Sequence, residues 1–244
     1  MKKTLTLVLL FIGLIINAQE NSINKITFEG LKRTKETFLK RLIRTKEGAV
    51  LDTLKIIGDV ERLKRLPGIA IANYAFAETP SGTDLTYTIE ENFTLISGLR
   101  IATANDGSSA YRISAFEFNL FGNNQLLGAF YEKNVFNSNG AFWEHAFLFS
   151  DKLVIDLNYQ DVTTQEPVFF EEGDKNYRFN SRNLESDLLF SFDFNNEAEM
   201  GAILVKESYS FEGNDPPPPN RPLNLNADKL IYRAAYRHVD LDIE

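Results

Sequence analysis

Apolar and polar residues alternate with a period of two in several runs of the chain after residue 93. Ile155, Leu157 and Tyr159 are separated by the polar residues Asp156 and Asn158, and the alternation returns between residues 184 and 194. Because successive side chains of a strand point to opposite faces of a sheet, this period predicts strands with one apolar and one polar face. The expected strands are Phe93–Ala102, Tyr111–Leu120, Gln125–Phe136, Ala141–Phe149, Lys152–Asp161, Tyr177–Phe194, Ala198–Phe211 and Lys229–Leu241.

The connections between these expected strands differ in length in a regular way. Every second connection is short, including the Phe121–Asn124 corner, whereas the long Val162–Asn176 and Glu212–Asp228 segments fall between the short ones. Outer-membrane barrels combine short periplasmic turns with longer outer loops. Strands of about ten residues also suffice for a tilted membrane crossing. The pattern therefore favours an antiparallel transmembrane β-barrel of about eight strands over a soluble sandwich.

The first part of the chain follows a helical period instead. We expect a strand at Ile23–Glu29 and then a helix capped by Thr34, with Phe38, Leu39, Leu42 and Ile43 on one face. A second helix is capped by Asp52, and its apolar positions are Leu54, Ile57, Val60, Leu63 and Leu66, with Ile56 alongside. Two strands follow, at Ile69–Ala77 and up to Glu90. The predicted order is strand, helix, helix, strand, strand, which is a small α+β module.

The extreme N-terminus has the pattern of a targeting segment. MKK is followed by an apolar stretch from Thr4 to Ile16 and by a cleavage site after Ala18, which predicts a signal peptide over residues 1–18. The mature chain would then consist of a periplasmic domain over 19–92 and a membrane domain over 93–244. The chain contains no cysteine, so disulfides do not contribute to its stability.

The charge of the chain is divided between these two regions. Residues 24–68 contain twelve Lys/Arg and six Asp/Glu, a balance of +6, whereas residues 69–244 contain twelve and twenty-seven, a balance of −15. The formal net charge of −8 gives no reason to expect nucleic-acid binding.

Two stretches resemble a known family. ITFEGLKRTKETFLKRLIRTKEG, DTLKIIGDVERLKRLPGIAIANY and GTDLTYTIEEN resemble one POTRA (polypeptide-transport-associated) domain, and FNLFGNNQLL resembles an early barrel turn of the BamA/TamA superfamily of outer-membrane insertases and transporters. The matching turn positions are Asn119, Leu120, Phe121, Gly122 and Gln125. The resemblance implies an outer-membrane protein that captures extended client polypeptide and aids its insertion into, or passage across, the outer membrane. The implied partners are unfolded clients, outer-membrane lipid and accessory assembly proteins.

The chain departs from that family in three respects. The family's barrel has sixteen strands, carries an Arg-Gly-aromatic motif and ends on an aromatic residue, whereas this chain has about eight expected strands, no Arg-Gly pair and no terminal aromatic residue. An open half-barrel would leave unpaired strand edges in hydrocarbon. We therefore expect the chain to be the N-terminal part of a longer protein, with a closed eight-stranded barrel as the alternative.

Candidate client-binding positions follow from strand addition, in which backbone bonds at a sheet edge hold an extended peptide. The first candidate edge is the strand Ile69–Ala77, with Ile71, Asn73, Tyr74 and Ala75. The second is the first barrel strand, the family's seam, with Leu95, Ser97 and Gly98, where the glycine would weaken local pairing.

No residue pattern predicts an enzyme, a cofactor or a metal site. A phospholipase pair of His145 and Ser150 is disfavoured because the two residues differ in strand parity. The alternative functions are a secretion pore dedicated to one partner and a passive porin-like barrel.

Overall fold

The computed structural model describes residues 22–104, 107–147, 152–171, 173–192, 196–212 and 222–238. The chain divides into two compact units between Asn92 and Phe93. The expected signal peptide lies outside the described residues. No helix in the described ranges combines the length and the apolar character that a membrane crossing requires.

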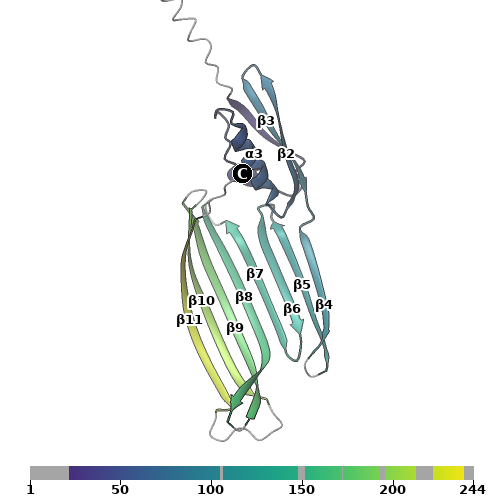
Figure 1. The fold of residues 1–244 in the computed structure, drawn as a ribbon, viewed down its shortest axis with the longest axis vertical. Coiled ribbons are helices and arrows are strands. Elements are labelled where there is room, and N and C mark those ends of the chain that lie inside the picture. The colour runs from purple at the N-terminus through teal and green to yellow at the C-terminus, as the bar shows by residue number, and fades with distance from the viewer. Residues whose placement is uncertain are drawn as a thin grey trace, which may run out of the picture. The chain divides into compact units, whose positions relative to one another are not determined.

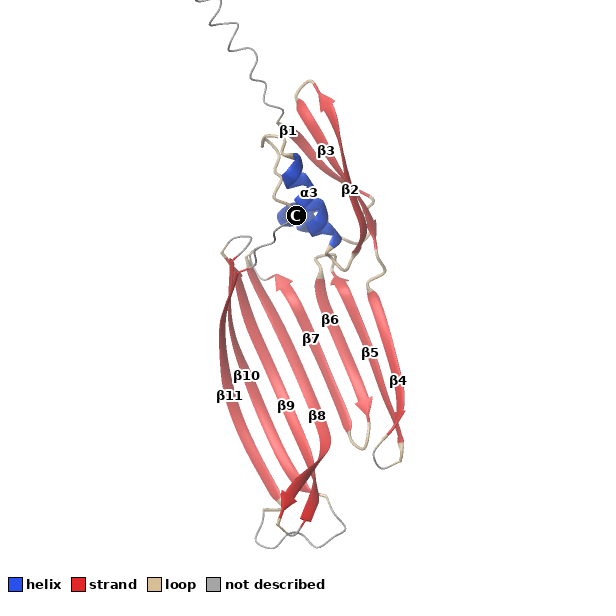
Figure 2. Cartoon of the chain, viewed as in Figure 1, coloured by secondary structure: helices blue, strands red, loops and turns tan. Residues whose placement is uncertain are grey.

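The first unit is a three-stranded sheet with two helices, in the order that the sequence predicts (Figure 2). Its strand order is β1-β3-β2, with β1 parallel to β3 and β2 antiparallel to it. Strand β2 therefore lies at an edge. The elements are β1 (Ile23–Glu29), α2 (Glu36–Leu42), α3 (Thr53–Lys64), β2 (Ile69–Thr79) and β3 (Gly82–Glu91).

The two predicted helix caps have different outcomes. The Asp52 side chain accepts a hydrogen bond from the Lys55 backbone N–H at 3.1 Å, as predicted. The prediction for Thr34 is wrong, because the N-cap position of α2 is Lys35, which makes no side-chain cap hydrogen bond. Thr34 is buried, and its backbone N–H donates to Glu91 at 2.8 Å. This bond to β3 holds residue 34 before the helix begins.

The buried face of α3 also differs from the expected one. Ile56, Val60 and Leu63 are buried, a spacing of four and three residues that keeps them on one side of the helix. Leu54 is 82% exposed and Ile57 is 39% exposed, so their assignment to the core face is wrong. A series of residues spaced three apart drifts around a helix of 3.6 residues per turn, which explains the error.

The second unit is an antiparallel eight-stranded sheet with the order β11-β10-β9-β8-β7-β6-β5-β4 (Figure 1). The predicted fold class is confirmed, and the sheet is open, with β4 and β11 at its edges. The strands are β4 (Leu95–Thr103), β5 (Ser109–Leu120), β6 (Gln125–Lys133), β7 (Asn137–Phe147), β8 (Leu153–Phe170), β9 (Gly173–Ser191), β10 (Asn196–Phe211) and β11 (Asn224–His238).

The prediction of a long loop at Val162–Asn176 is wrong. Strands β8 and β9 stay paired as far as Phe170 and Gly173, so that β8 to β11 reach past the ends of β4 to β7 (Figure 1). Aromatic contacts between β8, β9 and β10 hold this extension together, including Phe179–Tyr209 with ring centroids 4.6 Å apart. The polar Thr and Gln residues there indicate a loop by composition, but cross-strand packing decides the structure. Of the expected loop at Glu212–Asp228, residues 213–221 lie outside the described residues, and residues 224–228 belong to β11, so the loop prediction is wrong there.

Candidate functional site

Strand β2 presents a sheet edge whose side chains alternate between two surroundings. Ala72 is fully buried against the helix layer, whereas Ile71 is 43% exposed and Asn73 and Ala75 are also exposed. Tyr74 is half-buried and stacks on the exposed Phe76, with ring centroids 6.1 Å apart. All four candidate positions, from Ile71 to Ala75, thus lie on a strand paired on one side only.

The sheet that carries this edge is fixed to the helices by a buried carboxylate. Asp59 is fully buried on α3, and its side chain accepts hydrogen bonds from the backbone N–H groups of Arg44 at 2.7 Å and Thr45 at 2.8 Å. Arg62 forms an ion pair with Asp59 at 2.7 Å, and the Tyr87 hydroxyl on β3 donates to it at 3.4 Å. Burial raises the pKa of the Tyr87 phenol, so the hydroxyl stays protonated.

A second carboxylate ties the segment before α2 to the end of β3. Glu91 accepts hydrogen bonds from the backbone N–H groups of Arg33 at 2.9 Å and Thr34 at 2.8 Å. Burial acts to raise the pKa of Glu91, but these hydrogen bonds favour the charged form and lower the pKa overall.

Strand β4 is the first edge of the large sheet. Leu95 and Ser97 are exposed, and Gly98 lies opposite Ser114 on β5. A Cβ atom at Gly98 would lie 2.6 Å from the Ser114 hydroxyl oxygen, so glycine permits this close approach. Pairing with β5 continues through Gly98 without a register shift.

The β5–β6 corner reverses the chain with three residues in the left-handed region. The φ angles are 57° at Phe121, 71° at Gly122 and 54° at Asn124. The Gly122 and Asn124 N–H groups donate to the backbone oxygen and the side-chain oxygen of Asn119, at 3.0 and 2.9 Å. Asn119 and Gln125 are buried, and Gln125 accepts from the Trp143 indole at 3.2 Å. Phe121 is 65% exposed at the tip, so a bulky apolar residue occupies a strained position there.

The strand register separates the large sheet into two faces of different chemistry. Directly opposed residues share a face, and one set is mainly aliphatic and aromatic through the middle of the strands; we call it the apolar face. It is exposed, with Leu99 at 69% and Met200 at 70%. It includes Leu99, Ile101, Ile113, Tyr131, Trp143, Leu157, Tyr159, Leu184, Leu188, Phe190, Met200, Leu204, Leu230 and Tyr232.

The opposite face, which we call the polar face, carries charged and amide side chains. Its centre contains an ion-pair network in which Arg233 contacts Glu185, Asp187 and Glu199 at 2.8–3.1 Å. The carboxylate of Asp187 lies over Gly201, where a Cβ would come within 1.7 Å of its Oδ1 atom. Glycine at position 201 therefore gives Arg233 access across β10 to Asp187.

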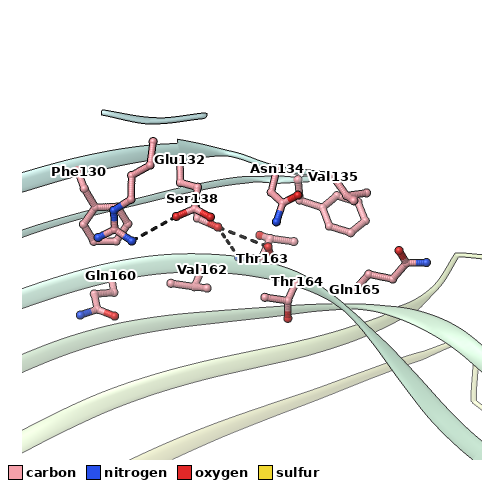
Figure 3. A pocket seen from close by; sticks show the side chains of 12 residues that line it. Phe130, Glu132, Asn134, Val135, Ser138, Gln160, Val162, Thr163, Thr164 and Gln165 are labelled. Carbon is pink, nitrogen blue, oxygen red and sulfur yellow. Dashed lines mark hydrogen bonds and ion pairs between the residues drawn. The ribbon is translucent and has the colours of Figure 1, made fainter. Parts of the chain in front are cut away.

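A cavity of 410 Å³ lies where β7 begins beside the extended β8 (Figure 3). Arg112 contacts Glu132 at 3.2 Å and lies 3.9 Å from the centre of the Phe130 ring. The Ser138 hydroxyl accepts from the Thr163 backbone N–H at 3.0 Å, so this side chain extends the β7–β8 ladder by one more bond. The walls combine the Phe130 and Phe136 rings with the Arg112–Glu132 ion pair.

The comparisons with known proteins agree with this geometry. Residues 22–92 match the POTRA family model, described as "Surface antigen variable number repeat". Residues 22–92 form a POTRA domain. No curated protein matches the chain.

The POTRA domain and the large sheet together are similar in fold to two solved structures. The chain is similar to BamA from Haemophilus ducreyi lacking POTRA domains 1–3, at 18% identity and a TM-score of 0.61, over 91% of this chain and 45% of that one. It is also similar to CdiB from Escherichia coli, at 12% identity and a TM-score of 0.52, over 91% of this chain and 43% of that one. The chain thus spans less than half the length of either structure. The resemblance to a POTRA domain followed by a partial BamA-type barrel is confirmed at the level of the fold.

Sequence reasoning found the POTRA edge and the barrel turn but missed the irregularity beside His145. The register shifts between Trp143 and Ala146, and His145 has a φ of 60° while its N–H donates to Asp156 at 2.6 Å. This bulge changes the strand parity on which the sequence argument relied, and Ser150 lies outside the described residues. The stretch from Ala141 to Phe147 contains no glycine or proline that would signal such a bulge.

Proposed function

We propose that this protein captures extended client polypeptide at a POTRA edge and aids its insertion into, or passage across, the outer membrane, without enzymatic chemistry. The observation that carries the proposal is a POTRA domain with one antiparallel edge strand, joined to an open sheet that has an apolar and a polar face. An exposed apolar face of this size needs lipid or another apolar cover. The protein would reside in the outer membrane, with its POTRA domain in the periplasm.

The POTRA edge suits a client that has not yet folded. An unpaired edge offers backbone N–H and C=O groups, so a strand added to β2 gains affinity without a required sequence. Ile71 and Phe76 are exposed along this strand on opposite faces of the sheet and would contact side chains on both faces of the added peptide. The same logic applies to β4, whose unpaired edge is adjacent to the exposed Leu95 and Leu99.

Proline scanning of β2 tests the proposal. In an antiparallel strand, the N–H groups of neighbouring residues point alternately to the paired side and to the open side. Of Asn73→Pro and Tyr74→Pro, one removes an outward N–H, and we expect that variant to reduce photocrosslinking of an unfolded outer-membrane client. Asn73→Thr keeps the N–H and serves as the control.

Hydrogen exchange of residues 22–92 identifies the proline variant that leaves the POTRA domain folded. Full client crosslinking in that folded variant would refute capture at β2. A passive porin-like barrel predicts no client crosslinking in any variant. A pore dedicated to one partner predicts crosslinking to that partner alone among several clients.

A further inference from the structure

The apolar face changes character along one row of residues near the ends of β8 to β11. This row consists of four residues in register: Asp161, Arg182, Lys206 and Asp228. The neighbouring row on the same face, nearer the middle of the sheet, consists of Tyr159, Leu184, Leu204 and Leu230. An apolar-to-charged transition at one height on four neighbouring strands is what the edge of a hydrocarbon layer requires.

The next two rows on this face remain polar, and we call all three rows the polar rim. The second row is Thr163, Asn180, Ser208 and Asn226, and the third is Gln165, Arg178, Ser210 and Asn224. The rim lies at the end of the sheet where β4 finishes, opposite the end where β4 begins after the POTRA domain. On the proposed function, which places the POTRA domain in the periplasm, the rim lies at the outer leaflet.

A cavity of 360 Å³ opens in the polar rim, and its lining consists of hydroxyl, amide and guanidinium groups and the carboxylate of Asp161. One wall is held in place, because Asp161 accepts from the Asn180 amide at 2.6 Å and from Arg182 Nε at 2.9 Å. Arg178 and Arg182 lie four residues apart on the same strand face, about 13 Å along the strand. Their side chains stay 48% and 54% exposed despite the ion pairs to Glu212 and Asp161.

The lining indicates the chemistry of the ligand. Guanidinium groups bind phosphate with two parallel hydrogen bonds, and the amides and hydroxyls between the two arginines match sugar hydroxyls. A volume of 360 Å³ falls in the range of pockets for drug-sized ligands and exceeds the needs of a lone phosphate.

We propose that the polar rim binds the sugar-phosphate headgroup of a glycolipid in the outer leaflet. Arg178 and Arg182 contact phosphate, and Asn180, Ser208 and Ser210 contact the sugar. Bound headgroups of this kind anchor the β8–β11 extension at the membrane surface. This inference rests on the proposed outer-membrane location.

The test uses the full chain reconstituted in phosphatidylcholine vesicles, with insertion first established by flotation and protease protection. Four ligands are compared: a phosphorylated glycolipid of the lipopolysaccharide type, the same lipid dephosphorylated, phosphatidylglycerol, and a soluble sugar phosphate. Native mass spectrometry of the extracted protein then counts retained ligand molecules per chain. We expect preferential retention of the phosphorylated glycolipid.

The double variant Arg178→Gln/Arg182→Gln should lower that retention by about a hundredfold, because each charged hydrogen bond contributes about tenfold and the variant removes at least two. Arg100→Gln is the matched control, since Arg100 lies on the polar face and is paired with Glu132 at 3.2 Å. The single variant Arg178→Gln keeps the Arg182–Asp161 ion pair. It therefore separates a loss of ligand binding from a loss of folding.

Each other outcome overturns the assignment. If the dephosphorylated lipid is retained equally, the rim does not recognise phosphate. If phosphatidylglycerol is retained equally, the rim does not recognise the sugar. If the soluble sugar phosphate binds equally, the ligand does not need to come from the membrane. An inserted protein with no lipid preference refutes this inference and leaves the proposed function standing. A chain that does not insert overturns the membrane location on which this inference rests, whereas crosslinking at β2 tests client capture separately.

Discussion

Asp59 is the residue on which the packing of the POTRA domain depends most directly. Four donors from α3, β3 and the segment after α2 converge on its two oxygens, and none of its surface is exposed. A buried carboxylate with satisfied oxygens fixes the relative positions of the elements that supply its donors. It therefore sets the position of the helix layer against the sheet that carries the β2 edge.

Replacing Asp59 by Ala should leave these donors buried in the core without an acceptor. Removing one partner of a buried ion pair costs roughly 3–5 kcal/mol, because the remaining charge and donors stay buried without a partner. We expect hydrogen exchange over residues 22–92 to accelerate by several orders of magnitude in Asp59→Ala. Glu61→Ala is the control, since its pair with Lys64 is exposed and should contribute well under about 1 kcal/mol. Equal protection in both variants would contradict the role given to Asp59.

Glu91 makes the stability of the POTRA domain depend on pH. Its folded pKa is lowered by the amides of Arg33 and Thr34, so it stabilises the fold fully above its unfolded pKa of about 4.3. This contribution is lost as the pH falls through the lower folded pKa. Protection of residues 22–92, corrected for intrinsic exchange, should therefore decrease on acidification below about pH 5, and less so in Glu91→Gln. The same acid dependence in both proteins would show that Glu91 is not the titrating group.

At the scale of elements, the sequence predicts the order of strands and helices well and their ends poorly. Periodicity is a property of a whole element, so β8 and β9 are found, but a polar stretch such as Thr163–Gln165 has no period that separates strand from loop. Its extended form depends on partners in β9, which a local pattern does not contain. The β2 edge was predictable from order alone, whereas the polar rim requires the register of four strands.

The β5–β6 corner holds Phe121 in an unfavourable backbone conformation. Gly122 adopts a φ of 71° without penalty, whereas Phe121 at 57° carries a side chain that disfavours this region. We expect Gly122→Ala to destabilise the sheet by about 1–2 kcal/mol. Phe121→Gly should relieve strain and partly offset that loss in the double variant. Thermal unfolding of the reconstituted protein, followed by the far-ultraviolet signal of the sheet, measures both changes.

If Phe121→Gly loses stability in bilayers but gains it in detergent, the exposed ring serves as an anchor at the membrane interface. A gain in both media would instead show that the strain at Phe121 serves no purpose in the membrane.

At the scale of the whole molecule, the division of the large sheet into two faces ties its fold to its proposed surroundings. Between the polar rim and the opposite ends of β8 to β11, the apolar face carries no charged side chain. On β8 this uncharged zone runs from Tyr159 to Leu153. The polar face carries ion pairs such as Arg233–Asp187 at 2.8 Å at the same heights. Only a medium that is apolar on one side and aqueous on the other satisfies both faces.

Matched arginine substitutions in β10 test this division directly. Met200 is 70% exposed in the middle of the apolar face, and Ile203 lies three residues on, on the polar face opposite Glu185. Arginine near the midplane of a lipid-facing strand costs about 2–4 kcal/mol, whereas arginine on a wet, acidic face finds a partner. We therefore expect Met200→Arg to shift insertion of the full chain into phosphatidylcholine vesicles toward the free form by a factor of about 30 or more. Ile203→Arg should insert nearly as well as the unchanged chain. Equal loss in both variants would mean that the two faces meet the same medium, and the membrane assignment of the sheet would fail.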